Sequence, residues 1–176
     1  LYAGDPQIGA CKNQISSENE KMKNEIAARN DAFNWNKTLN NAITAHPEVS
    51  FMLSAGDQVN YADREYEYAG YLNASALASL PVSTTIGNHD SGSYQYSYHF
   101  NTPNSFDLDD TTYALGHTNA GTDYYYTYGD ALFIVIDTNN YNCATHRNVI
   151  EKAVNENKDK KWRIVMFHQD IYLSLI

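Results

Sequence analysis

One local pattern occurs four times along this chain: an apolar, β-prone segment ends in a loop whose first residues include a polar side chain. Short apolar segments without helix caps are typical of buried strands. Because parallel strands present their carboxyl ends at one edge of a sheet, we expect the polar side chains to gather there. The segments and the residues that follow them are 1–4 with Asp5, 49–54 with Asp57, 81–86 with Asn88, and 162–167 with His168.

The segments between these strands have helical or hairpin patterns. Apolar residues recur at helical spacing between residues 16 and 46, which predicts one or two helices, and residues 64–80 and 142–157 are also compatible with helices. Residues 124–128 and 131–136 are joined by a two-residue turn that contains glycine, which predicts an antiparallel hairpin. Strands that alternate with helices predict an α/β sandwich.

The size and charge of the chain restrict its class. Its 176 residues, 43% of them hydrophobic, fit one ordinary domain with a single core. The formal net charge of -9 would repel a nucleic acid backbone, so we expect no nucleic acid partner. No apolar run approaches the roughly 20 residues that span a bilayer, and we expect no membrane anchor.

The cysteine and tyrosine content gives weaker indications. Cys11 and Cys143 lack the spacing of a structural zinc site, and a disulfide between them stays open. The 15 tyrosines favour a secreted or extracytoplasmic location. Tyr94, Tyr96 and Tyr98 alternate as in a strand or an aromatic pocket wall, and we expect them to pack rather than to bind substrate.

Each strand-end polar residue could by itself be an ordinary turn or cap residue. Gathered at one sheet edge, however, two carboxylates such as Asp5 and Asp57 would repel one another unless cations lay between them. The sequence therefore predicts a metal site. Asp137 also follows an apolar run, but residues 137–140 are equally good turn chemistry, so we leave Asp137 out of the predicted ligands. His46, His99 and His146 are expected to be structural.

The loops carry a set of motifs that resembles the calcineurin-like metallophosphoesterases. The motifs are Gly-Asp-Pro-Gln at 4–7, Gly-Asp-Gln-Val-Asn-Tyr at 56–61, Gly-Asn-His-Asp at 87–90 and Val-Met-Phe-His at 165–168. Tyr61 is similar to the tyrosine of the purple acid phosphatase branch. The resemblance implies a four-layer α/β/β/α sandwich of mixed β-sheets flanked by helices, and a single catalytic domain over residues 1–176.

The same resemblance implies roles for individual residues. Asp57 would bridge two metal ions, with Asp5 and Tyr61 on the first ion and Asn88 and His168 on the second. Asn88 and His89 would contact the phosphate, and His89 would donate a proton or hydrogen bond to the leaving oxygen. A metal-bound hydroxide would be the nucleophile, because coordination lowers the pKa of water from 15.7 to roughly 7.

The residue types also bear on the identity of the metals. A phenol with an ordinary pKa of about 10 gives up its proton most readily to a strongly Lewis-acidic ion, so Tyr61 favours ferric iron in the first position. Zinc, manganese or a second iron would occupy the other position. The expected cofactors are therefore iron together with one of these three.

Two departures from the family pattern concern the ligand set. Gln7 stands where related enzymes carry histidine or glycine, and its role stays open. The family's last motif, Gly-His-x-His, is expected after His168 and is absent, so we expect the domain to be incomplete at its C-terminus. Residues 116–119 imitate that motif but precede His168, and we interpret them as a loop.

The sequence thus predicts a binuclear-metal hydrolase of small-molecule phosphate esters, with monoesters favoured over diesters. The alternative is a phosphatase-like binding or surface module that keeps the fold and lacks activity. Metal analysis combined with a ligand screen would separate the two.

Overall fold

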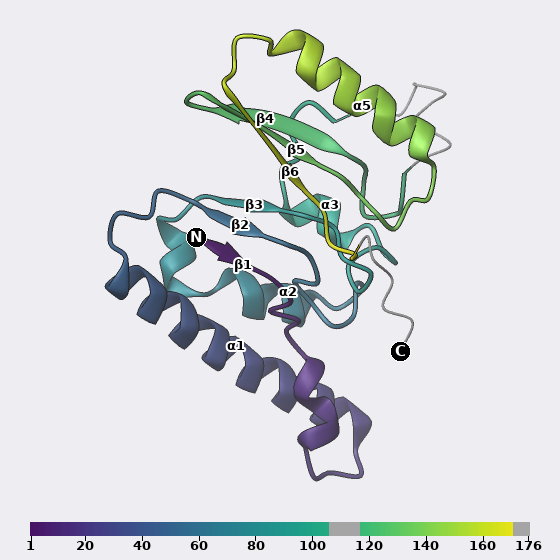
Figure 1. The fold of residues 1–176 in the computed structure, drawn as a ribbon. Helices are drawn as coiled ribbons and strands as arrows, with labels where there is room; N and C mark the ends of the chain where they lie inside the picture. The colour runs from purple at the N-terminus through teal and green to yellow at the C-terminus, as the bar shows by residue number, and fades with distance from the viewer. Residues whose placement is uncertain (106–116, 171–176) are drawn as a thin grey trace.

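A computed structural model of the chain describes residues 1–105 and 117–170, and their elements form an α/β sandwich. Figure 1 shows four layers: α1 and α2, then the β1-β2-β3 sheet, then the β4-β5-β6 sheet, then α5. The predicted fold class is therefore confirmed. In chain order the elements are β1 (Tyr2–Ala3), η1 (Ala10–Gln14), α1 (Glu20–Ala45), β2 (Met52–Ser54), α2 (Glu65–Leu72), η2 (Ser75–Ala78), β3 (Val82–Thr84), α3 (Gln95–His99), β4 (Tyr124–Tyr128), β5 (Ala131–Val135), α5 (Cys143–Glu156) and β6 (Trp162–Met166).

The first sheet is parallel, in the order β1-β2-β3. The long helix α1 covers it and buries Trp35 and Leu39. This helix begins where the Asn19 side chain accepts a hydrogen bond from the Met22 amide, and it ends at His46, before a proline. One continuous helix thus fills the region in which the sequence allowed one or two.

The second sheet has the order β4-β5-β6. Strands β4 and β5 form the predicted antiparallel hairpin, and β6 runs parallel to β5. Helix α5 covers this sheet with Val149 and Ala153 buried beneath it, which also confirms the predicted helix in this region. Because β5 and β6 are parallel, the chain after β6 leaves the sheet at the same end as the chain after β5.

The two sheets pack face to face through aromatic side chains. The Tyr124 hydroxyl donates to the Thr84 carbonyl oxygen at 2.7 Å, which joins β4 to β3. Phe51 and Phe133 meet edge to face, with ring centroids 5.6 Å apart. These contacts fix the separation of the sheets and, with it, the separation of the loops at their ends.

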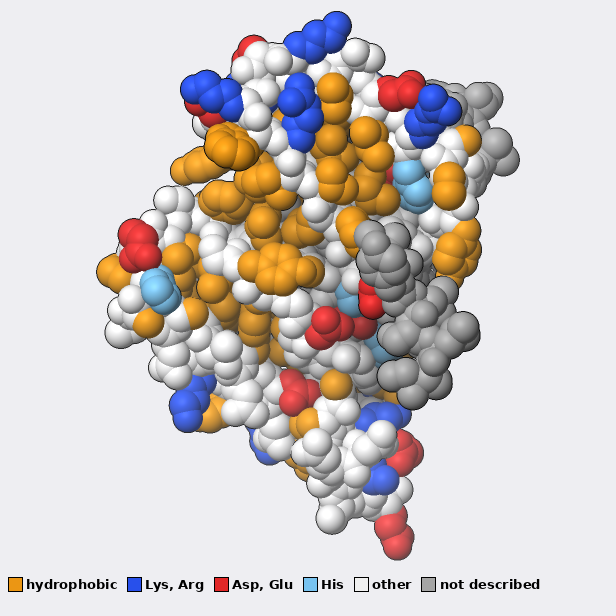
Figure 2. All heavy atoms as spheres, viewed as in Figure 1, with side chains coloured by type: hydrophobic (Ala, Val, Ile, Leu, Met, Phe, Trp, Pro, Cys, Tyr) orange, Lys and Arg blue, Asp and Glu red, His pale blue; other side chains and the backbone are white. Residues whose placement is uncertain are grey.

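The expectation that β6 is a buried strand is wrong. Trp162 is 68% exposed and Val165 is 49% exposed. Figure 2 shows hydrophobic side chains gathered over this face of the molecule. The reason is that β6 is the last strand of its sheet, and no described element covers its outer side.

The alternating tyrosines do not form a strand. Tyr96 and Tyr98 belong to the short helix α3, and Tyr94 is its N-cap residue; Tyr96 is buried, while Tyr94 and Tyr98 are exposed. The Tyr96 hydroxyl is hydrogen-bonded with Thr84 Oγ1 at 2.6 Å, so the tertiary contact to β3 determines which tyrosine is buried. The expectation that this series packs holds for Tyr96.

Two further expectations concern a membrane-spanning helix and a disulfide between the two cysteines. Among the described residues, no helix has both the length and the apolar composition that crossing a bilayer requires. Cys11 and Cys143 are free thiols. Burial and the neighbouring Asp31 raise the pKa of the Cys11 thiol to about 11, which makes it a poor nucleophile at neutral pH.

Candidate metal centre

Four predicted ligands lie on loops that leave the carboxyl ends of the first sheet. Asp5 follows β1, Asp57 and Tyr61 follow β2, and Asn88 follows β3. The first two loops run side by side, since the Gln7 amide donates to the Asp57 carbonyl oxygen at 2.8 Å. The fifth predicted ligand, His168, follows β6 in the other sheet. The expectation of a single common sheet edge is therefore wrong, because two stacked sheets contribute loops to the same place.

The backbone of these loops is strained at the predicted ligands. Asp5 and Asp57 both have a φ of 50°, in the left-handed region that non-glycine residues avoid at a cost of about 1–2 kcal/mol each. Gln7 has a φ of 38°. Its amide side chain donates to Asn60 Oδ1 at 3.2 Å, so Gln7 ties the first loop to the second. Strain of this kind persists only where the surrounding structure holds the residue in place.

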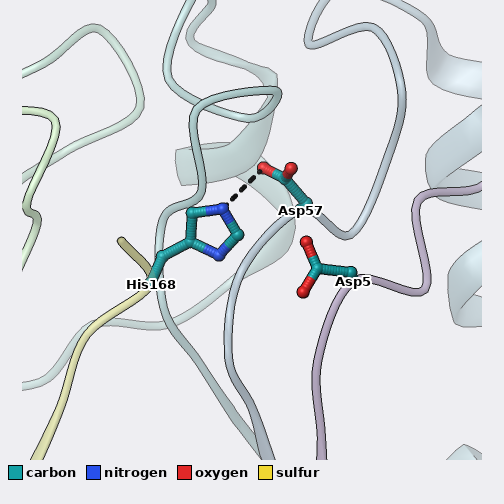
Figure 3. Close-up of side chains that lie close together, drawn as sticks. All are labelled: Asp5, Asp57 and His168. Carbon is teal, nitrogen blue, oxygen red and sulfur yellow. Dashed lines mark ion pairs between the residues drawn. The ribbon is translucent and has the colours of Figure 1, made fainter. Parts of the chain in front are cut away.

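Asp5, Asp57 and His168 bring their donor atoms together, all within 4.8 Å of one another. Figure 3 shows the two carboxylates and the imidazole pointing toward a common space. Asp57 is only 4% exposed, and its Oδ1 lies 3.5 Å from His168 Nε2. Two carboxylates and one imidazole are a donor set that suits zinc, iron or manganese. The geometry of the described residues therefore fits a metal ion.

The tautomer of His168 follows from its hydrogen bonds. Its Nδ1 lies 2.7 Å from the Ala55 carbonyl oxygen, which can only accept, so Nδ1 carries the proton. Nε2 faces Asp57 and Asn88 Oδ1, which is 3.2 Å away, and both are acceptors, so without a metal ion Nε2 also carries a proton; a metal ion bound at Nε2 would replace that proton. A histidine oriented in this way by a carbonyl is typical of metal ligands.

Asp57 and His168 perturb each other's ionisation. The hydrogen bond to Asp57 raises the pKa of His168 to about 9, against the opposing effect of burial. Burial acts to raise the pKa of the Asp57 carboxyl, but hydrogen bonds from His168 and from the His89 amide outweigh it, so the pKa of Asp57 is lowered. The site thus holds an anionic carboxylate with its positive counter-charge on the histidine.

Two glycines allow this close approach. A Cβ atom at Gly56 would lie 2.4 Å from His168 Nδ1, and one at Gly87 would lie 2.0 Å from Asp57 Oδ1. Gly56 also has a φ of 96°, which favours glycine by itself. The glycines that precede Asp57 and Asn88 in the two motifs are therefore required for packing around the cluster.

His89 and Asn88 lie beside the cluster. The His89 amide donates to Asp57 Oδ1 at 2.9 Å, and its ring Nδ1 donates to the Asn60 carbonyl oxygen at 2.7 Å. Nε2 is therefore the ring atom available for a substrate. Asn88 is exposed, with its Oδ1 toward His168.

Tyr61 has cationic neighbours. Its hydroxyl accepts a hydrogen bond from Lys12 Nζ, and the Arg64 guanidinium lies 3.7 Å from the ring centroid. Its amide donates to Glu67 Oε2 at 2.7 Å. Metal binding by Tyr61 stays a prediction.

Two buried acids near the site were missed in the sequence. Asp90 accepts hydrogen bonds from the amides of Gly87, Gln58 and Val59, and Glu67 accepts them from the amides of Asn60 and Tyr61. Both side chains are fully buried, and burial raises the pKa of each to about 7. They hold the loops rather than face the cluster. Two features of the sequence could have indicated them. Asp90 is the last residue of the Gly-Asn-His-Asp motif, and Glu67 is an acid within an aromatic helical segment.

Asp137 and the loop at 117–119 are not part of the three-residue cluster. Asp137 Oδ2 accepts a hydrogen bond from Thr118 at 2.7 Å, and the Asn119 side chain donates to the Gly92 carbonyl oxygen. Gly116 lies outside the described residues. These contacts agree with the interpretation of this segment as a loop.

A family model described as calcineurin-like phosphoesterase matches residues 3–175. No curated protein matches the chain. The match spans the loops that carry all five predicted ligands.

Proposed function

Because the chain belongs to the calcineurin-like phosphoesterase family, whose members are metal-dependent phosphoester hydrolases, we propose that it hydrolyses phosphate esters at a binuclear metal centre. Small monoesters are the favoured substrates and diesters the second choice, in the manner of purple acid phosphatases. The observation that carries this proposal is the cluster of Asp5, Asp57 and His168, with donor atoms within 4.8 Å of one another.

The ligands divide into two sets that share Asp57. Asp5 and Tyr61 would hold the first ion, and Asn88 and His168 the second. Asp57 suits the shared position because it is buried, anionic and directed at both neighbours. When bound, a pair of such ions supplies Lewis acidity to the phosphate oxygens and to water.

The protein residues would bind and orient the substrate. Asn88 is exposed beside His168, where its amide can donate to a phosphate oxygen. His89 is fixed by its Nδ1 hydrogen bond to Asn60, so Nε2 can hold a proton against the leaving oxygen. The hydrogen bond that the His89 amide donates to Asp57 keeps this ring next to the cluster.

Iron is the proposed metal in the first position, with zinc, manganese or a second iron beside it. The support is the tyrosine itself, because phenolate is a ligand for strongly Lewis-acidic ions. An absorption band in the visible range would report a Tyr61–ferric bond. The band should be lost in Tyr61→Phe and kept in Tyr94→Phe, a change at the exposed tyrosine that precedes α3.

The direct test is hydrolysis of a chromogenic phosphate monoester and diester by the full-length protein loaded with iron and zinc. We expect turnover at mildly acidic to neutral pH, faster for the monoester, and its loss on chelation. Absence of turnover with both esters would overturn the enzyme proposal. Binding of metal and phosphate without turnover would instead support the binding-module alternative.

A further inference from the structure

One asparagine after β5 contacts the loops of both sheets. The Asn139 side chain Nδ2 donates to the carbonyl oxygens of Ile86 and Gly87, each at 3.2 Å, immediately before Asn88. Its Oδ1 accepts a hydrogen bond from the Gln169 side chain at 2.7 Å, immediately after His168. A single amide therefore links the backbone next to one predicted ligand to the residue next to another.

Hydrogen-bond partners fix the orientation of this amide. Besides the two carbonyl oxygens, Nδ2 also donates to Asp137 Oδ1 at 2.9 Å. All three partners are acceptors, so a flipped Asn139 would place its own oxygen against two carbonyls and a carboxylate. The donor side of Asn139 must face the first sheet, and its acceptor side must face Gln169.

The loop that carries Asn139 is anchored to the rest of the second sheet. The Asp137 amide donates to Asp123 Oδ1 at 2.8 Å, and Asp123 Oδ2 lies 2.6 Å from His146 Nδ1. Asp123 and Asp137 are buried, at 0% and 2% exposure. His146 belongs to α5, so the position of Asn139 is tied to the helix that covers this sheet.

The contact matters because Asn88 and His168 belong to different sheets. No strand pairing joins the two sheets among the described residues, yet Asn88 Oδ1 and His168 Nε2 lie only 3.2 Å apart. Two ligands of one ion must be held within about 0.5 Å of their productive positions. Asn139 is placed to provide this alignment, since it contacts both loops one residue away from each ligand.

We infer that Asn139 is a positioning residue that sets the separation of Asn88 and His168 and thereby the affinity of the second metal ion. This inference rests on the proposed function, because it requires a second ion at these two residues. In this proposal Asn139 binds neither substrate nor metal. It acts through the Gly87 carbonyl and Gln169.

The test is calorimetric titration of the metal-free full-length protein with zinc, together with turnover and urea denaturation. In Asn139→Asp the donor becomes an acceptor that faces three oxygens. We expect zinc affinity at one of two sites to fall about 10–100-fold, as for other residues that orient metal ligands, with the other site unchanged. Turnover should fall by a similar factor through kcat.

The matched control is Asn157→Asp. Asn157 is also half-buried, and its Nδ2 donates to a backbone carbonyl oxygen, that of Ala153, at 2.8 Å, at the far end of α5. This change should lower stability without altering either metal site. Because Asn139→Asp introduces like-charge repulsion with Asp137 and could prevent folding, Asn139→Ala serves as the second variant, removing the donor without adding charge.

The outcomes separate the two proposals. If the natural protein binds fewer than two ions and shows no turnover, the proposed function fails and the inference fails with it. If the natural protein binds two ions and is active, but a folded Asn139→Ala variant binds both as tightly, only the role of Asn139 is overturned. A selective loss at one site, absent from Asn157→Asp, supports it.

Discussion

Two aspartates that follow strands, Asp57 after β2 and Asp137 after β5, have almost the same burial and very different surroundings. They are 4% and 2% exposed. Asp57 faces Asp5 and His168 with its donor atoms directed at a common space. Asp137 accepts hydrogen bonds from Thr118 and from both the amide and the side chain of Asn139. One carboxylate faces a shared centre, and the other is saturated by neutral donors.

Their ionisation differs in the same way. Burial raises the pKa of Asp137, and its hydrogen bonds only partly oppose this. Burial acts on Asp57 too, but the ionisable His168 and the His89 amide lower its pKa. Burial is thus no guide to the role of a strand-end aspartate. The charge of its hydrogen-bond partners is the better guide. An anionic carboxylate that faces other ligands can bind a cation, whereas a carboxylate whose oxygens all accept from neutral donors only holds a loop.

The sharpest test of this comparison is Asp57→Asn. The amide cannot supply two anionic oxygens to a shared position, so turnover should fall by about 10³-fold, at the upper end of what the loss of one electrostatic group costs an enzyme. Steady-state kinetics with a chromogenic ester and zinc titration would measure the effect, with circular dichroism to verify folding. Activity within tenfold of the natural protein would contradict the assignment.

A second test moves His168 away from Asp57 and leaves Asp137 in place. Gly56→Ala places a Cβ 2.4 Å from His168 at a residue with positive φ, so we expect a loss of about 3 kcal/mol in unfolding free energy, with weaker metal binding. Gly129→Ala is the control, because Gly129 also has positive φ and nothing lies within 4 Å of its added Cβ. It should lose about 1 kcal/mol by urea denaturation. Equal losses would show that the contact with His168 does not matter.

The same amide substitution at the other strand end should be mild. Asp137→Asn keeps an acceptor for Asn139, and the Thr118 hydroxyl can turn to accept from the new amide. We expect about 1 kcal/mol of destabilisation by urea denaturation and turnover within tenfold of the natural protein. A fall in turnover as large as that of Asp57→Asn would mean that Asp137 belongs to the centre.

The smallest expected effect concerns His146, which is hydrogen-bonded with Asp123, the residue that accepts from the Asp137 amide. The Asp123 carboxylate, which accepts a hydrogen bond from His146 Nδ1, raises the pKa of His146 above its ordinary value of 6.5, although burial opposes it. Protonated His146 therefore stabilises the fold fully below pH 6.5, and this contribution is lost as the pH rises through the raised pKa. As the pH rises from 6.5 through the raised pKa, the denaturation midpoint should decline less in His146→Gln than in the natural protein. Parallel declines in both proteins would contradict this.

Local patterns in the sequence predicted most elements of the fold. Asn19 and Pro47 bound α1, and the glycine turn at Gly129 gives the hairpin, because caps and turns depend on a few neighbouring residues. The buried β6 was a wrong prediction, and the strand that the sequence left open as one alternative for the tyrosines is not formed. Exposure of Val165 and burial of Tyr96 depend on which elements pack against them, and a local pattern does not contain that information.

The sequence by itself determined the polar residues that end its strands and the motifs that identify the family. Only the tertiary structure brought His168 from the second sheet to Asp5 and Asp57 from the first, separated Asp57 from Asp137, and placed Asp90, Glu67 and Asn139 behind the loops. The physical reason is the distance along the chain between residues that interact. Strand ends and turns are fixed by neighbours in the chain, whereas the partners of a buried carboxylate or amide come from residues far along it, and these partners decide whether it binds a cation or holds a loop.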